Sequence, residues 1–116
     1  MANYHGFNDS VSRHTQNLAS TAWVIYSPTD ELIASGGRCL GLATNNVVEY
    51  QAAIGFMTEA LTNGISHLII YLDSQLVVSQ LNGFYSINDH MLLCLFQRIH
   101  LSARSFEFIL YRYVPR

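Results

Sequence analysis

Three of the eight acidic residues stand where carboxylates could do chemistry. Asp9 lies in or at the end of a first extended segment, Glu49 lies in the first turn of a predicted helix, and Asp73 directly follows an apolar strand. The end of a buried strand is the usual place for chemistry in an α/β sheet. Three carboxylates that converge there would repel one another unless a cation lay between them. Oxygen-only ligands suit hard divalent cations such as Mg²⁺ and Mn²⁺, so the pattern favours a metal site.

Each of these acids also has a structural interpretation. Glu49 near a helix N-terminus is favoured by the helix macrodipole alone. Asp73 can serve as the N-cap of the helix that follows it, and Asp9 can be a turn residue. The positions of the three acids therefore do not decide by themselves between a structural and a catalytic role.

Three extended segments are predicted in the first third of the chain. They cover residues 3–10, 20–27 and 31–40. The second segment is β-rich because it contains Trp23–Tyr26, and the turn Ser27–Asp30 joins it to the third, since proline presets φ. Gly36-Gly37 is expected to mark a bulge in the third strand. Short strands joined by short turns indicate an antiparallel meander.

A helix is predicted after the third strand. Its apolar residues recur at spacings of three and four: Tyr50, Ala53, Ile54, Met57 and Leu61. Candidates for its N-cap are Thr44, Asn45 and Asn46, and Asn46 with Glu49 three residues later resembles a capping box. The helix is expected to end at Asn63-Gly64, because glycine suits the left-handed position after a helix.

The rest of the chain predicts a strand, two helices and a last strand. The continuous apolar run His67–Leu72 indicates a strand covered on both faces. Helices capped at Asp73-Ser74 and Asn88-Asp89 follow, and the last strand spans Phe106–Tyr113. The residues of the final helix expected to face inward are Met91, Leu92, Leu95, Ile99 and Ala103. The order β-β-β-α-β-α-α-β predicts an α/β fold with a mixed five-stranded sheet, whose late strands pair in parallel.

Composition narrows the class of protein. With 116 residues, half of them hydrophobic, the chain is expected to form a single domain, residues 1–116. The net charge of -2 lacks the positive excess that is typical of proteins that bind nucleic acid or an anionic membrane. No segment is long and apolar enough to span a membrane, and the N-terminus lacks the layout of a signal peptide. Cys39 and Cys94 are isolated, so we expect reduced, buried cysteines in an intracellular protein of the cytoplasm or nucleus, away from membranes.

Three strings of the sequence resemble type I ribonuclease H domains. Ala43–Tyr50 reads ATNNVVEY and resembles the family's ATNN-x-x-EY segment. Asp73–Gly83 resembles the DSQLVV-x-Q-x-x-G segment, and Tyr113–Arg116 resembles the HVPR string that ends the fifth strand. The resemblance runs from about Phe7 to Arg116, which is nearly the whole chain.

The resemblance implies a ribonuclease H-like fold and a metal-dependent endonuclease that hydrolyses the RNA strand of RNA–DNA hybrids. Family members hold two divalent ions, usually Mg²⁺ with Mn²⁺ as a substitute; one lowers the pKa of the attacking water and the other stabilises the leaving 3′ oxygen. Asp9, Glu49 and Asp73 match the first three family acids, which are catalytic and bind the metals. The positions that match nucleic-acid contacts are Ser10, Thr44, Asn45, Asn46, Ser74 and Gln75.

The chain departs from the family pattern at two places. Ser10 stands where the family usually has glycine, which permits close approach of the backbone to a ribose. The chain stops at Arg116, ahead of the family's final helix and the fourth acid on it. Without that helix an apolar face of the sheet would be uncovered, so we expect a homodimer or higher oligomer through that face. Candidates for the contact are Phe106, Phe108, Tyr111 and Tyr113.

Two functions other than catalysis stay open on these departures. The chain could be a catalytically inactive ribonuclease H-like domain that binds nucleic acid, or a protein-interaction domain. A salt-dependent affinity for hybrid would indicate the binding domain. Metal-dependent cleavage that is abolished by Asp73→Asn would indicate the enzyme.

Overall fold

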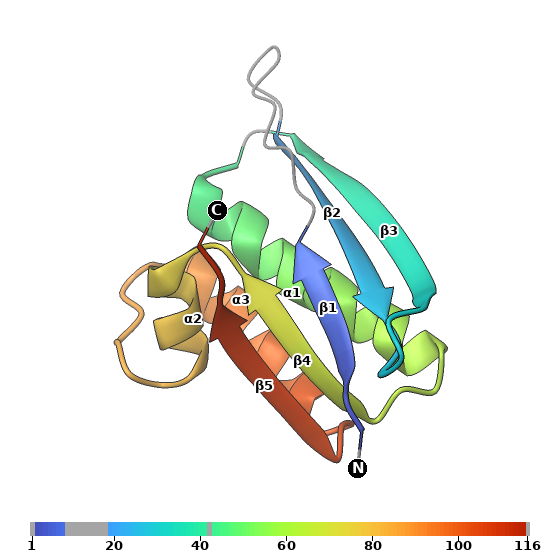
Figure 1. Ribbon diagram of the computed structural model, residues 1–116. Helices are drawn as coiled ribbons and strands as arrows, with labels where there is room; N and C mark the ends of the chain where they lie inside the picture. The colour runs from blue at the N-terminus through green and yellow to red at the C-terminus, as the bar shows by residue number, and fades with distance from the viewer. Residues whose placement is uncertain (1, 9–18, 42, 116) are drawn as a thin grey trace.

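The computed structural model describes residues 2–8, 19–41 and 43–115. The element order agrees with the sequence prediction (Figure 1). The strands are β1 (Tyr4–Asn8), β2 (Ala19–Tyr26), β3 (Leu32–Gly41), β4 (His67–Leu72) and β5 (Phe108–Tyr113). The helices are α1 (Asn45–Thr62), α2 (Gln75–Leu81) and α3 (His90–Ala103).

The five strands form one mixed sheet in the order β3-β2-β1-β4-β5. β1 pairs antiparallel with β2, and β2 pairs antiparallel with β3, which confirms the predicted meander. β4 lies parallel to both β1 and β5. The central strands β1 and β4 therefore end side by side at the same edge of the sheet, and this edge positions the candidate site.

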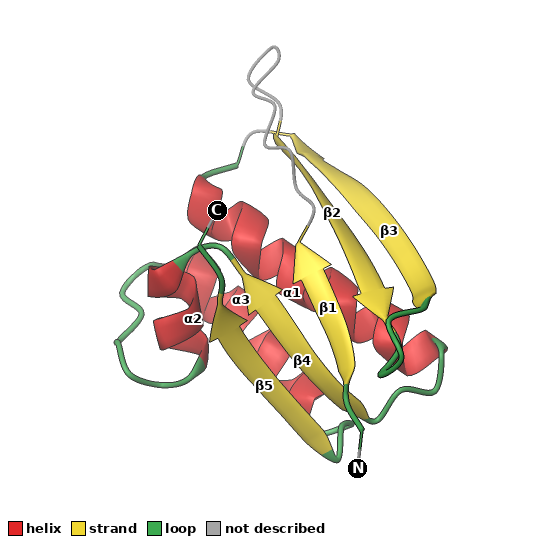
Figure 2. Ribbon diagram, in the orientation of Figure 1, coloured by secondary structure: helices red, strands yellow, loops and turns green. Residues whose placement is uncertain are grey.

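The helices pack on one face of the sheet, where the core lies (Figure 2). α1 crosses β1 and β2 very closely, because two glycines leave room for aromatic rings. A Cβ on Gly6 would lie 2.7 Å from Cδ1 of Phe56, and a Cβ on Gly55 would lie 2.4 Å from the Trp23 ring. Dense packing of this kind holds α1 in one place relative to the end of β1.

The other face of the sheet carries a row of aromatic side chains. The rings of Phe7 and Tyr71 stack with centroids 4.7 Å apart, and Tyr26 meets Phe7 edge-on. His5 Nδ1 lies 3.1 Å from the Tyr71 hydroxyl, within hydrogen-bond distance. Phe7 and Phe108 are 38% and 40% exposed. In the described part of the chain no helix lies over this face, and no described helix is long and apolar enough to cross a membrane.

The helix caps follow the prediction in part. Thr44 is the N-cap of α1, Ser74 that of α2 and Asp89 that of α3. The capping box of Asn46 and Glu49 is wrong, because Asn46 already lies inside α1. The position of Gly64, with φ of +71°, agrees with a left-handed residue after the helix.

Several burial predictions are wrong for reasons of geometry. Cys39 lies on the edge strand β3 and Cys94 on the solvent side of α3, so both thiols are exposed. Met91 is 61% exposed, because the buried stripe of α3 starts one residue later at Leu92. Gly36 forms a regular pair with Trp23, and the register shifts of this strand pair lie elsewhere.

The last strand begins two residues later than expected. It starts at Phe108, and Phe106 is buried just before it. Tyr111 is buried as well, so neither Phe106 nor Tyr111 is available for contact with another chain. Phe108 and Tyr113 keep the exposure that the oligomer prediction requires.

Candidate active site

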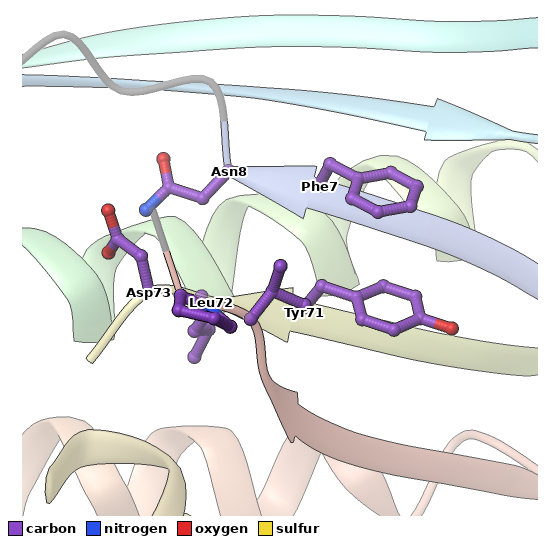
Figure 3. A pocket seen from close by; sticks show the side chains of 7 residues that line it. Phe7, Asn8, Tyr71, Leu72 and Asp73 are labelled. Carbon is purple, nitrogen blue, oxygen red and sulfur yellow. The ribbon is translucent and has the colours of Figure 1, made fainter. Parts of the chain in front are cut away.

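The carboxyl ends of β1 and β4 bring Asn8 and Asp73 together. Phe7 pairs with Tyr71 in the parallel ladder, so Asn8 comes level with Leu72, and Asp73 follows directly. Asn8 and Asp73 line one hollow with the ends of both strands and with Val114 and Pro115 (Figure 3). An end of this kind in a sheet with parallel strands is where α/β proteins place their chemistry.

Glu49 enters this region from α1. It is only 6% exposed, although it is an acid. The amide Nδ2 of Asn8 donates a hydrogen bond to Glu49 Oε1 over 2.8 Å, between residues 41 positions apart in the chain. A buried carboxylate is costly unless polar partners compensate it, so its place here calls for a reason beyond helix formation.

The structure contradicts both structural explanations of these acids. Glu49 is the fifth residue of α1, beyond the first turn, where the macrodipole acts. Asp73 is not the cap of α2, because Ser74 holds that position and its Oγ accepts from Val77 N at 3.3 Å. Glu49 and Asp73 are therefore not explained by the local needs of their helices.

The neutral residues predicted to contact nucleic acid lie at two helix starts. Thr44 caps α1, with its Oγ1 accepting from Val47 N at 3.3 Å. Asn45 is exposed on the first turn of α1, and Asn46 beside it is half-buried. Gln75 is the exposed first residue of α2, directly after Asp73 and Ser74. Asp9 and Ser10, the two remaining predicted site residues, lie outside the described residues.

The oxygen atoms at this edge suit a hard divalent cation. Glu49 and Asp73 supply carboxylates, and Asn8 holds one of them by its hydrogen bond to Glu49 Oε1. Among residues 2–8, 19–41 and 43–115, no group of three or more acids, histidines or cysteines is placed to hold a metal ion. The third predicted acid, Asp9, follows Asn8 in the chain and is outside that search. Ligand atoms that are all oxygen are of the type that Mg²⁺ and Mn²⁺ prefer.

A buried hydrogen bond joins the two helices that carry the site. The hydroxyl of Tyr50 donates to Gln80 Oε1 over 2.7 Å, and Tyr50 is fully buried while Gln80 is 7% exposed. Burial raises the pKa of Tyr50 to about 12, so the phenol stays protonated and remains a donor. Because Tyr50 follows Glu49, this bond also fixes the part of α1 from which Glu49 projects.

The sequence patterns do not indicate the roles of three members of this arrangement. Asn8 gives one signal, since it precedes Asp9 at the end of a predicted strand. Gln80 belongs to a string that resembles the family, and Tyr50 is an apolar position of a predicted helix. Neither pattern indicates that Tyr50 and Gln80 meet, because they are 30 residues apart.

Comparisons with known proteins extend over nearly the whole chain. A sequence model of the family described as reverse transcriptase-like matches residues 3–116. Ribonuclease HI of Halobacterium salinarum is 38% identical over 85 residues, which are 73% of this chain and 43% of that protein. The chain spans less than half the length of the curated relatives it matches.

Solved structures share the fold. The crystal structure of RNase H1 from Halobacterium salinarum is 33% identical, with a TM-score of 0.89, and the match covers 99% of this chain and 87% of that one. LC11-RNase H1, solved in complex with an RNA/DNA hybrid, is 22% identical, with a TM-score of 0.87 and coverage of 98% and 86%. The first match extends the relationship beyond fold, and the second shows the fold alone.

Proposed function

Since the chain belongs to the type I ribonuclease H family, we propose that it is a metal-dependent endonuclease that hydrolyses the RNA strand of RNA–DNA hybrids. The observation that carries this proposal is the pair of Glu49 and Asp73. Glu49 is a buried carboxylate, and Asp73 follows the buried strand β4. Both lie at the same end of the sheet, and neither is the N-cap of a helix. Acids that the fold brings to the carboxyl end of a sheet with parallel strands in this way are candidates for catalysis.

In this proposal Asp9, Glu49 and Asp73 bind Mg²⁺, with Mn²⁺ as a substitute. The chemistry that the bound ion supplies is activation of a water molecule and stabilisation of charge on the leaving 3′ oxygen. Glu49 contributes a carboxylate whose orientation α1 and Asn8 restrict, so little reorganisation is needed when the ion binds. Asp73 lines the hollow at the end of β4, and we propose that an RNA strand binds over this end of the sheet.

The neutral residues around the acids suit a hybrid duplex. A hybrid presents 2′-hydroxyls and base edges in a shallow minor groove, where amides can both donate and accept. Asn45, Asn46 and Gln75 supply amides at two helix starts. Thr44 and Ser74 accept backbone hydrogen bonds as caps, and their hydroxyl protons can still be donated to the substrate. Ser10 would contribute a further hydroxyl in this proposal.

Cleavage of a hybrid labelled on both strands, with Mg²⁺ and then with Mn²⁺, tests the proposal. We expect RNA-strand cleavage by the wild-type chain and a loss of at least about 100-fold in Asp73→Asn, since removing one charged ligand or electrostatic group costs that much in comparable sites. Asp30→Asn is the matched control. Asp30 lies in the turn between β2 and β3, at the opposite end of the sheet, with φ of 65°, which asparagine tolerates.

The open face of the sheet supports the alternative function. Phe7 and Phe108 are exposed there, and such a face suits a non-catalytic protein-interaction domain. A folded wild-type chain that cleaves no hybrid with either metal would favour this alternative over the enzyme. Self-association through the same face stays a prediction under both functions.

A further inference from the structure

Asn8 occupies a position between the two described acids of the site. It is the last residue of β1, it donates to Glu49 Oε1 at 2.8 Å, and it lines the same hollow as Asp73 (Figure 3). The Nδ2 atom of Asn8 must be the donor in this hydrogen bond, because an ionised carboxylate can only accept. The amide therefore presents its NH₂ group to Glu49.

The geometry behind this contact is built into the fold. Side chains alternate along a strand, so Asn8 points to the same face as Gly6, toward α1. Gly6 lets Phe56 of α1 approach the strand, where a Cβ would be 2.7 Å from the ring. Glu49 precedes Phe56 by seven residues, two helical turns, and so projects from the same side of α1. Asn8 thus meets Glu49 because the tight contact at Gly6 sets the height and orientation of the helix.

The chemistry of the amide suits a carboxylate that must stay available to a cation. Glu49 is only 6% exposed, and burying a carboxylate costs free energy, part of which a hydrogen bond from a donor compensates. An arginine or lysine could compensate it too, but its positive charge would repel a divalent ion. An asparagine stabilises the carboxylate without adding charge.

Resting on the proposed function, we propose that Asn8 is a positioning residue, which orients the Glu49 carboxylate for Mg²⁺ and hybrid cleavage. It acts through Glu49 and needs no contact of its own with the substrate. Its loss should therefore weaken the binding of Mg²⁺ and slow the reaction, and leave the KM for hybrid within about twofold of the wild-type value.

The test compares Asn8→Leu with Asn82→Leu. Leucine is close in size to asparagine but has no donor. Asn82 is a matched control because its Nδ2 also makes a long-range hydrogen bond, to Tyr111 O at 3.2 Å, and that bond joins α2 to β5 outside the acid cluster. Mg²⁺ binding is measured by calorimetry without substrate, and kcat, KM and the Mg²⁺ concentration for half-maximal rate are measured with hybrid.

For Asn8→Leu we expect an approximately tenfold weaker Mg²⁺ affinity and an approximately tenfold lower kcat, as for loss of a hydrogen bond to a charged group. Asn82→Leu should lower the melting temperature and change neither quantity by more than about twofold. Equal effects in the two variants, or an unchanged Mg²⁺ affinity in Asn8→Leu, would overturn the inference.

A cycle of variants without metal separates this inference from the proposed function. Asn8→Leu, Glu49→Ala and the double variant are unfolded with urea in the presence of EDTA. If the contact forms, the double variant should shift the unfolding midpoint by less than the sum of the two single shifts. Additive shifts would reject the contact even in an active enzyme. A wild-type chain that neither binds Mg²⁺ nor cleaves hybrid would reject the proposed function, and the cycle would still decide whether Asn8 holds Glu49.

Discussion

The substitution Tyr50→Phe should destabilise the fold by removing one buried hydrogen bond. Phenylalanine keeps the ring, so the packing of the fully buried side chain is preserved. The substitution removes the 2.7 Å hydrogen bond from the Tyr50 hydroxyl to Gln80 Oε1. Gln80 is only 7% exposed, so its Oε1 loses this donor inside the protein. A buried acceptor that loses its donor costs about 1–3 kcal/mol.

This free energy converts into a measurable shift of the melting temperature. For a chain of this size, 1 kcal/mol corresponds to about 4 °C, so Tyr50→Phe should melt about 4–12 °C below the wild type. Circular dichroism during heating and urea unfolding measure the change independently. Tyr85→Phe is the control, since Tyr85 is 61% exposed and its substitution should cost less than about 0.5 kcal/mol.

The same hydroxyl gives the substitution a pH signature. Burial raises the pKa of both Tyr50 and Tyr111 from 10.0 to about 12. The unfolded chain therefore loses these protons first, so the stability from the neutral phenols is complete below pH 10.0 and falls as the pH rises through about 12. Tyr50→Phe removes one of the two contributions and should lose stability less steeply across this range.

Two results would refute this reasoning. The first is a melting temperature within 2 °C of the wild type, about 0.5 kcal/mol on the same conversion, because the bond would then contribute almost nothing. The second is an unchanged steepness of the alkaline decline, which would mean that Tyr50 is not the group that titrates. A large loss in Tyr85→Phe as well would point to a general sensitivity of the fold to tyrosine replacement.

Two further predictions concern packing and assembly. Gly6→Ala should lower the free energy of unfolding in urea by about 1–3 kcal/mol, because its Cβ would lie 2.7 Å from the ring of the fully buried Phe56. The double variant with Phe56→Leu should regain part of this free energy. An unchanged unfolding midpoint in Gly6→Ala would contradict the close contact. Self-association through the open sheet face should give a mass in light scattering above the 13.1 kDa of one chain, and Phe108→Ser should reduce it. A mass of 13.1 kDa for the wild type at all concentrations would count against the oligomer.

Much of the architecture follows from local patterns. The element order was predicted correctly from three local signals. They are the β-rich run Trp23–Tyr26, the three-and-four spacing after Asn46 and the continuous apolar run His67–Leu72. These signals are local because strands and helices expose side chains with different periods. The strings around Glu49 and Asp73 pointed in the same way to the family.

Cap and burial predictions failed where the answer depended on neighbours in space. Asn46 and Thr44 are both good N-cap residues, and α1 begins directly after Thr44. Cys39 and Cys94 read as small apolar residues, but one lies on a sheet edge and the other on the solvent side of a helix. The glycine pair of β3 read as a bulge, whereas Gly36 leaves room for Trp23, whose Nε1 would lie 2.6 Å from a Cβ there.

The sequence by itself determined the order of the elements, the family and the acids Asp9, Glu49 and Asp73 as candidates for catalysis. Only the tertiary structure decided that Glu49 is buried, that Asn8 donates to it, and that Ser74 rather than Asp73 caps α2. The physical reason is distance along the chain. Periodicity and capping are set by residues within a few positions, whereas Asn8 and Glu49 are 41 positions apart. They meet because two parallel strands end, and the closely packed α1 begins, at one edge of the sheet.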